Sequence, residues 1–185
     1  MSAAGLRTAL AFALAALCFA IYAQVRHHEF VDYDDYITIL HYDALEVYSI
    51  SEAVRVAVTP YHANWIPLTT LSLALDRWLY GSDPRGYLLT NVALHALASA
   101  LLFLALDAMT GAPWRSAFVA AVFAAHPLHV ESVAWATERK DVLCGVFWML
   151  ALAAHGRYAR DWSRPCATPR FSPARSSRCW PSPWP

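Results

Sequence analysis

Charged residues are scarce in this sequence, and the two signs balance. Aspartate, glutamate, lysine and arginine make up 15% of the 185 residues, and the formal net charge is zero. A soluble domain usually carries about 25% charged residues. The low charge content argues against a soluble domain, and without an excess of positive charge no nucleic-acid partner is expected.

Cysteine is also scarce, and its four positions follow no pattern. Cys18 and Cys144 lie inside apolar runs, whereas Cys166 and Cys179 lie near the C-terminus without CxxC spacing. Regular cysteine spacing is typical of disulfide frameworks and zinc sites. We therefore expect neither a disulfide nor a cysteine-bound metal.

Apolar residues are abundant, at 58% of the chain, and they form long runs. About 20 apolar residues cross a bilayer as a helix, because lipid offers the backbone no hydrogen-bonding partners. Four spans are predicted, at residues 6–25, 87–109, 114–125 and 142–158. The third ends at Ala125 because Pro127 follows shortly, and proline kinks or ends a helix. The predicted fold class is all-α, a multi-pass transmembrane helix bundle within residues 1–160.

The first run has a second interpretation, as a cleaved signal peptide. One basic residue precedes its apolar part, and small residues near Ala23 resemble a cleavage site. The run is longer than a usual signal core and further spans follow it. These two features favour an uncleaved anchor.

The segment between the first two spans, residues 26–86, is acidic and rich in aromatic residues. Residues 52–58 and 68–79 show helical spacing of apolar positions. One face of the second stretch needs an apolar partner; it comprises Leu68, Leu71, Leu75, Trp78 and Leu79. We expect this loop to pack against the bundle as interfacial helices, since tryptophan and tyrosine favour that environment.

Basic residues in short loops predict the orientation, because they favour the cytoplasmic side. Under the four-span arrangement, one side holds Arg7, Arg115, Arg157 and Arg160. The acidic loop 26–86 and the segment 126–141 then share the opposite, external face.

The tail, residues 161–185, has no periodicity and is rich in proline, serine, arginine, cysteine and tryptophan. One interpretation is a disordered cytoplasmic tail. The other is a frameshifted end, because residues 174–185, back-translated with GC-rich codons of our choice, give an apolar sequence in another frame. We favour the frameshift hypothesis.

Two polar clusters lie on the predicted external face. The first holds Asp34 and Asp35, and a carboxylate there can act as a general base toward a hydroxyl group. The second covers residues 126–141, where Arg139 and Lys140 suit a phosphate. The alternatives are an ordinary acidic loop and an interfacial patch of salt bridges. We expect the two clusters to converge on one cavity, with the aspartates near His129, Glu131 or Arg139.

Histidines in the second cluster invite a metal interpretation, but His126, His129 and Glu131 do not form an HExxH motif. We expect no metal and no cofactor, and assign these side chains to lining a cavity or capping a helix. Asn91 and His95 lie one helical turn apart in the second span. Polar residues placed in this way typically form hydrogen bonds between membrane helices.

Four stretches carry a resemblance to a known family. They are FVDYDDYITIL, NWIPLTTLSLALDRWLYG, GYLLTNVALHALASALLFLAL and HPLHVESVAWATERKDVLCGVFWMLAL. Together they resemble the N-terminal membrane part of the transmembrane and tetratricopeptide-repeat proteins, over residues 20–160. These proteins are similar to the protein O-mannosyltransferases, which are membrane glycosyltransferases of the GT-C fold.

The resemblance implies a partial GT-C-like fold with interfacial helices in the first external loop. It implies an enzyme that moves a sugar, mannose, from a polyprenyl-phosphate carrier to a serine or threonine of an acceptor protein. The family's catalytic acidic motif matches Asp34 and Asp35. The residues expected to bind the substrate are His126, His129, Glu131, Glu138, Arg139 and Lys140. The enzyme would lie in a bacterial inner membrane or the endoplasmic reticulum, with its active face periplasmic or lumenal.

The sequence also departs from the family, whose members have further spans and an array of helical repeats of about 34 residues each. We therefore expect a truncated fragment of a transferase, without independent activity. The alternatives are a noncatalytic membrane scaffold or assembly segment, and a transporter. Charges outside the first span disfavour the transporter, which more often carries them at the midplane of the membrane.

The predicted topology places both termini in the cytoplasm, residue 60 outside and residue 112 inside. Single cysteines at Pro60 and Ala112, probed with a membrane-impermeant thiol reagent in intact cells, test it. Only the cysteine at position 60 should be labelled. Labelling at position 112, or protection at position 60, would contradict the four-span arrangement.

Overall fold

The computed structural model describes residues 2–41, 45–60 and 64–162, and the regular elements in these ranges are all helical. Three helices are long and apolar enough to cross a membrane: α1 (Ala3–Ile21), α4 (Pro84–Thr110) and α7 (Arg139–Trp162). The predicted all-α, multi-pass class is confirmed. The frameshift hypothesis concerns residues that lie, apart from the last turn of α7, outside the described ranges.

Shorter helices connect these three. They are η1 (Ala23–His27), η2 (Tyr36–Leu40), α2 (Ile50–Val58), α3 (Pro67–Tyr80), α5 (Pro113–Ala125) and α6 (His129–Ala134). Proline occupies the first turn of α3, α4 and α5, where its missing N–H costs no hydrogen bond. Gly111 ends α4 at a φ of 68°, a left-handed conformation that glycine adopts without strain.

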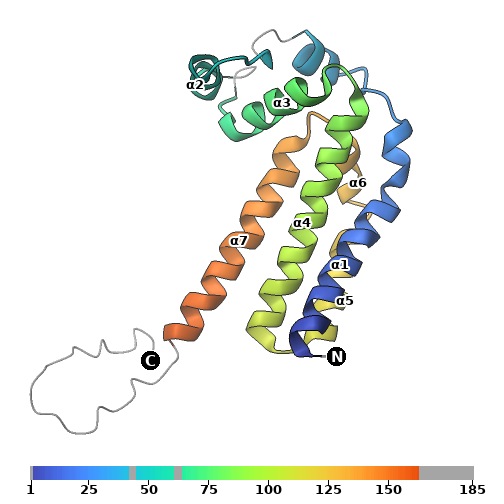
Figure 1. Cartoon of the computed structure of the whole chain (residues 1–185), viewed down its shortest axis with the longest axis vertical. Coiled ribbons are helices and arrows are strands. Elements are labelled where there is room, and N and C mark those ends of the chain that lie inside the picture. Colours follow the sequence, from blue (N-terminus) through green and yellow to red (C-terminus); the bar gives the residue numbers. More distant parts are fainter. Residues whose placement is uncertain (1, 42–44, 61–63, 163–185) are drawn as a thin grey trace, which may run out of the picture.

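Helix α4 is the centre of the bundle, and α1, α5 and α7 pack around it (Figure 1). Small side chains such as Ala98, Ala117 and Ala120 let the helices approach closely. Phe103 fills the space between them and is completely buried. At the end that carries the N-terminus, Arg7 Nε donates to Asp107 Oδ2 at 2.7 Å and joins α1 to α4.

The chain runs along the bundle four times. Helix α1 runs toward the long loop between α1 and α4, α4 runs back, α5 and α6 return, and α7 runs back again (Figure 1). The start of α1 and the end of α7 therefore lie at the same end. Helix α5 has 13 residues, or about 20 Å, which is short against a hydrocarbon core of about 30 Å. The four-span topology stays a prediction.

Helices α2 and α3 of the long loop lie at the end of the bundle where α4 and α7 begin (Figure 1). Helix α3 contacts α4 and α7, as expected of the loop. The face that makes this contact is not the predicted one, because the buried residues are Thr69, Thr70, Leu73, Ala74 and Asp76. Leu68, Leu75 and Trp78 are each more than half exposed. The polar face turns inward because Asp76 has an ionic partner there.

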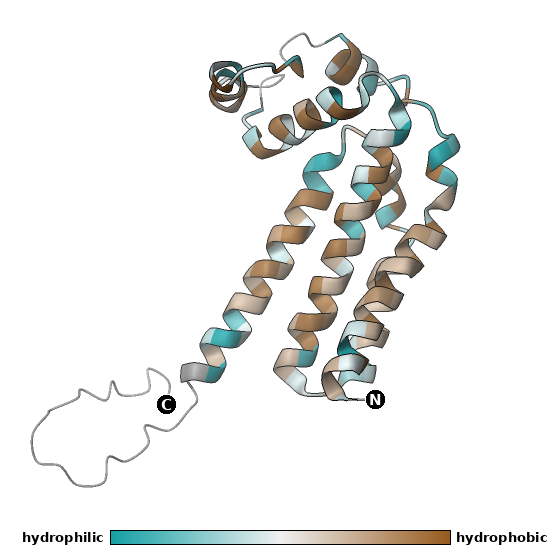
Figure 2. Cartoon of the chain, in the orientation of Figure 1, coloured by the Kyte–Doolittle hydropathy of each residue, from teal (hydrophilic) through white to brown (hydrophobic). Residues whose placement is uncertain are grey.

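Hydropathy separates the bundle into zones (Figure 2). The middle of α4 and of α7 is apolar, whereas the first turn of α7, which begins at Arg139, is hydrophilic. The first turn of α7 meets α3 and α4, so polar groups gather at one end of an otherwise apolar bundle. This distribution is typical of an integral membrane protein with a polar site at one membrane surface.

Arg139, in the first turn of α7, is completely buried and joins three helices. Its Nη2 group donates to Asp76 Oδ2 on α3 at 2.5 Å and to the carbonyl oxygen of Tyr87 on α4 at 2.9 Å. Its Nε donates to Asn91 Oδ1. Burial raises the pKa of the Asp76 carboxyl, and the adjacent guanidinium opposes this shift. A buried ion pair is tolerated only when additional hydrogen bonds of this kind satisfy both charges.

The two polar residues of the second predicted span behave as expected. Asn91 Nδ2 donates to the carbonyl oxygen of Trp135 at 2.9 Å, and His95 Nε2 lies 3.2 Å from the carbonyl oxygen of Ala124. Both partners lie on other segments of the bundle. The prediction that Asn91 and His95 form hydrogen bonds between helices is confirmed.

Replacing Arg139 by methionine should lower the free energy of unfolding by about 3–5 kcal/mol, because Asp76 is left buried without a counter-ion. The matched control is Lys140→Met, whose exposed pair with Glu138 contributes about 1 kcal/mol at most. Thermal unfolding of the detergent-purified proteins measures both. The double variant Arg139→Met with Asp76→Leu should recover most of the loss. Equal effects of Arg139→Met and Lys140→Met would contradict this role.

Candidate functional site

Asp35 joins the two polar clusters. It is 1% exposed, and its Oδ1 accepts hydrogen bonds from the backbone N–H of Thr137, at 3.0 Å, and from the Thr137 hydroxyl. Its Oδ2 accepts a hydrogen bond from the backbone N–H of Val31 at 3.0 Å. Asp35 and Thr137 are 102 positions apart in the chain. The carboxylate therefore fixes the first cluster onto the segment that leads into α7.

Asp34, by contrast, is exposed and lines a cavity of about 450 Å³. We call this space the Asp34 cavity, and its walls come from the long loop, α3 and the start of α7. It is lined by Asp34, Ile37, Thr38, Asn64, Ile66, Thr69, Leu73, Thr137 and Lys140. A carboxylate, three threonine hydroxyls, an amide and an ammonium group thus face one space. Such a set can bind a polar ligand and hold a proton acceptor beside it.

Lys140 supplies the positive charge of the Asp34 cavity. Its Nζ donates to Glu138 Oε1 at 2.7 Å, and the Lys140 side chain is 46% exposed. An exposed ion pair of this kind contributes little to stability. The ammonium group can therefore exchange its carboxylate partner for an anionic ligand at low cost.

Arg139 does not line the Asp34 cavity, although it directly precedes Lys140. Successive residues of an α-helix point about 100° apart, so the two cations face different surroundings. The Arg139 guanidinium is committed to Asp76 and Asn91 in the interior. Of the two cations predicted to hold a phosphate, only Lys140 faces the cavity.

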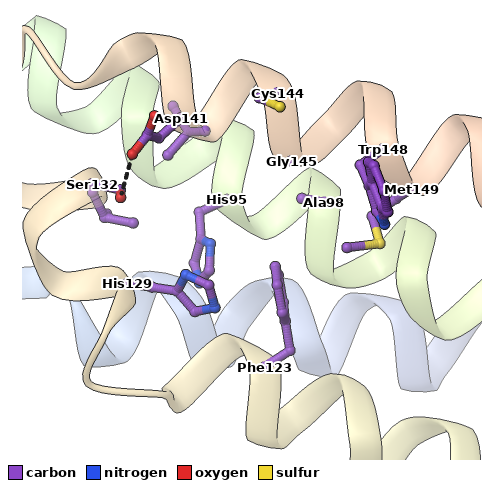
Figure 3. Close-up of a pocket in the computed structure, with 12 residues that line it drawn as sticks. His95, Ala98, Phe123, His129, Ser132, Asp141, Cys144, Gly145, Trp148 and Met149 are labelled. Atoms are coloured by element: carbon purple, nitrogen blue, oxygen red, sulfur yellow. Dashed lines mark hydrogen bonds between the residues drawn. The ribbon is translucent and has the colours of Figure 1, made fainter.

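The histidines of the second cluster lie elsewhere. His129 lines a second cavity, of about 300 Å³, together with His95 and Phe123 (Figure 3). Burial, and secondarily the nearby His126, lower the pKa of His129, so its ring is neutral at pH 7. His126 is exposed, and its Nδ1 accepts a hydrogen bond from the backbone N–H of Leu128 at 3.3 Å. Glu131 is exposed on α6 and lines neither cavity.

The expected convergence of the two clusters thus takes a narrower form. Asp35 binds Thr137, and Asp34 lines one cavity with Thr137 and Lys140. His129, Glu131 and Arg139, the residues expected near the aspartates, do not line this cavity. Within the described ranges, no group of three histidine, cysteine, aspartate or glutamate side chains is placed to hold a metal ion.

Sequence reasoning did not single out Thr137, which both lines the cavity and binds Asp35. The available signal was its position, as a hydroxyl residue directly before the charged run Glu138 to Asp141. Thr69 was also not predicted, because the leucines of α3 indicated that the opposite face of this helix would be buried.

Comparison with known proteins gives consistent relatives. The chain is 34% identical to protein O-mannosyl-transferase tmtc2 of Xenopus laevis over 119 residues. These aligned residues are 64% of the chain and 13% of that protein. It is 40% identical over 105 residues to protein O-mannosyl-transferase Tmtc1 of Drosophila melanogaster, covering 55% of the chain and 12% of the relative. Human protein O-mannosyl-transferase TMTC4 is 29% identical over 121 residues, which are 58% of the chain and 16% of the relative.

The chain thus spans between 12% and 16% of the length of these three relatives. No protein-family model matches it, and neither does any solved structure.

The two aspartates should differ in their effect on stability. Asp35→Ala leaves the N–H groups of Val31 and Thr137 without their acceptor, so the free energy of unfolding should fall by about 1–3 kcal/mol. Asp34→Ala should change it by less than about 0.5 kcal/mol, as for other surface positions. Thermal unfolding of the two purified variants tests this difference. A larger loss in Asp34→Ala than in Asp35→Ala would refute it.

Proposed function

Because the chain belongs to the transmembrane and tetratricopeptide-repeat (TMTC) family, whose members carry the name protein O-mannosyl-transferase, we propose that it forms the donor-binding and proton-accepting part of a membrane glycosyltransferase. The donor is a sugar, mannose, linked to a polyprenyl phosphate. The acceptor is a serine or threonine hydroxyl of a protein. The site faces the periplasm or the lumen of the endoplasmic reticulum.

The observation that carries this proposal is that Asp34 and Lys140 line the same cavity. A transfer from a lipid phosphate to a hydroxyl needs a base for the hydroxyl proton and a cation for the leaving phosphate. The Asp34 cavity holds one side chain of each kind: the base comes from the first polar cluster and the cation from the second. A scaffold has no need for this combination.

An apolar groove supports the lipid nature of the donor. The groove has a volume of about 260 Å³ and begins at Lys140, which it shares with the Asp34 cavity. It continues along α7 past Leu143 and Phe147, with Leu68 of α3 on the other side. Residues 140, 143 and 147 share one face of the helix. A phosphate at Lys140 would thus have its sugar in the cavity and its polyprenyl chain in the groove.

The reaction follows from this arrangement. The acceptor oxygen attacks the anomeric carbon of the sugar while its proton passes to the Asp34 carboxylate. The bond between the anomeric carbon and the phosphate oxygen breaks, and its electron pair leaves with the lipid phosphate. Lys140 stabilises the negative charge that develops on the phosphate in the transition state. Direct attack inverts the configuration at the anomeric carbon.

Asp35 and Arg139 act as positioning residues in this proposal. Asp35 holds the loop that carries Asp34 against Thr137, and Arg139 holds α3 against the start of α7. Neither side chain lines the Asp34 cavity. Their replacement would move its walls rather than remove a reacting group.

Asp34→Asn should reduce sugar transfer by a factor of about 10² to 10⁴, the usual contribution of a general base, without weakening donor binding. Lys140→Met should weaken donor binding. Because the chain alone is expected to be inactive, the first effect is measured in membranes that contain a full-length relative with the corresponding aspartate replaced. The assay follows transfer of labelled mannose from polyprenyl-phosphate mannose to a serine- and threonine-containing peptide. Quenching of tryptophan fluorescence by the donor measures the second.

The matched control is Asp32→Asn, which removes a carboxylate two positions away that lines neither cavity. It should change neither quantity. Transfer at the parent rate by Asp34→Asn would remove this residue from the base role. Failure of the donor to bind the parent chain would refute the assignment of the cavity.

A further inference from the structure

The second cavity, which we call the His129 cavity, lies over α4 between α5 and α7 (Figure 3). One part of its wall is polar and includes His95, His129, Ser132 and Asp141. The other part is apolar and includes Phe123, Trp148 and Met149. A space with one polar and one apolar end fits an amphiphilic molecule.

The charge of the His129 cavity is opposite to that of the Asp34 cavity. Lys140 lines the Asp34 cavity, and the next residue, Asp141, lines the His129 cavity. A carboxylate in the wall attracts a cation. The ligand of the His129 cavity should therefore be cationic where it meets Asp141, and the glycosyl donor has no cationic group.

Two hydrogen-bond acceptors at the polar end remain available. Ser132 Oγ donates to Asp141 Oδ2 at 3.3 Å, and no hydrogen bond within the described part of the chain uses Asp141 Oδ1. The His129 ring likewise has no hydrogen-bond partner among the described residues, and its lowered pKa keeps it uncharged at pH 7. An ammonium group carries three N–H donors, so it can donate to Asp141 Oδ1 and still offer N–H groups to a further acceptor.

The two ends of the cavity match the depth profile of a bilayer. Asp141 lies in the first turn of α7, and Trp148 follows it by seven residues, or about 10 Å along the helix axis. Because α7 is long and apolar enough to span the membrane, its first turn reaches the level of the lipid headgroups. Trp148 then lies beside the acyl chains.

We propose that the His129 cavity binds an aminophospholipid, phosphatidylethanolamine, with its ammonium group on Asp141 and an acyl chain between Phe123 and Trp148. The ammonium of this lipid donates hydrogen bonds, whereas the choline group of phosphatidylcholine has the same charge but no N–H donors. Phosphatidylglycerol has no cation. This lipid site does not depend on the proposed transferase reaction.

Native mass spectrometry of the delipidated chain tests the site. The protein is mixed with equal amounts of phosphatidylethanolamine, phosphatidylcholine and phosphatidylglycerol of identical acyl chains. The ethanolamine lipid should be retained about tenfold more than either of the others, the factor that one charge-assisted hydrogen bond provides. Asp141→Asn should abolish this preference, and the control Asp32→Asn should keep it.

A second variant tests the apolar end independently of the charge. Gly145 lines the cavity, and a Cβ atom there would meet Ala98 at 4.0 Å, an ordinary contact. Gly145→Leu should therefore fill the cavity while improving the helix propensity of α7. It should reduce retention of the ethanolamine lipid about tenfold. Any of three results would overturn the proposal. The parent could retain the three lipids equally, Asp141→Asn could keep the preference for the ethanolamine lipid, or Gly145→Leu could retain this lipid fully.

Discussion

The buried guanidinium of Arg139 is the interaction on which the arrangement of this molecule depends. It belongs to α7, but its partners Asp76, Tyr87 and Asn91 belong to α3 and α4. A charge with no exposed surface holds its position only while these partners stay in place. The Asp34 cavity has walls on the long loop, on α3 and at the start of α7, and their separation is set by this contact. The polar interior of the loop thus determines the shape of the candidate site, even though Arg139 does not line it.

Helical rotation divides the charged run at the start of α7 among three environments. Arg139 faces the interior, Lys140 faces the Asp34 cavity, and Asp141 faces the His129 cavity. Each step of about 100° changes both the neighbours and the solvent exposure of the side chain. Adjacent cavities can consequently select ligands of opposite charge with residues that are consecutive in the sequence. An insertion or deletion within this turn would reassign every one of these charges.

Much of this organisation could be predicted from apolar run lengths and polar spacing. The all-α class follows from the run lengths, and the bonding roles of Asn91 and His95 follow from their placement one turn apart. The end of α5 at Ala125 follows from Pro127. The sequence could not predict that Arg139 would be buried while Lys140 lines the Asp34 cavity, because these positions depend on the rotation of α7 against α3. The inward face of α3 was likewise hidden, since Asp76 becomes an inward residue only when a buried cation 63 positions later meets it.

The separation of 63 positions between Asp76 and Arg139 also imposes an order of events during synthesis. The carboxylate leaves the ribosome first, and α4 and α5 are made before its counter-ion exists. Until then, α3 cannot bury its polar face without an uncompensated charge, so it stays at the aqueous surface of the membrane. Insertion of α7 delivers the guanidinium and allows α3 to dock. The long loop is thus assembled last although it is translated early, and the candidate site comes into being only when the fourth pass of the chain along the bundle is under way.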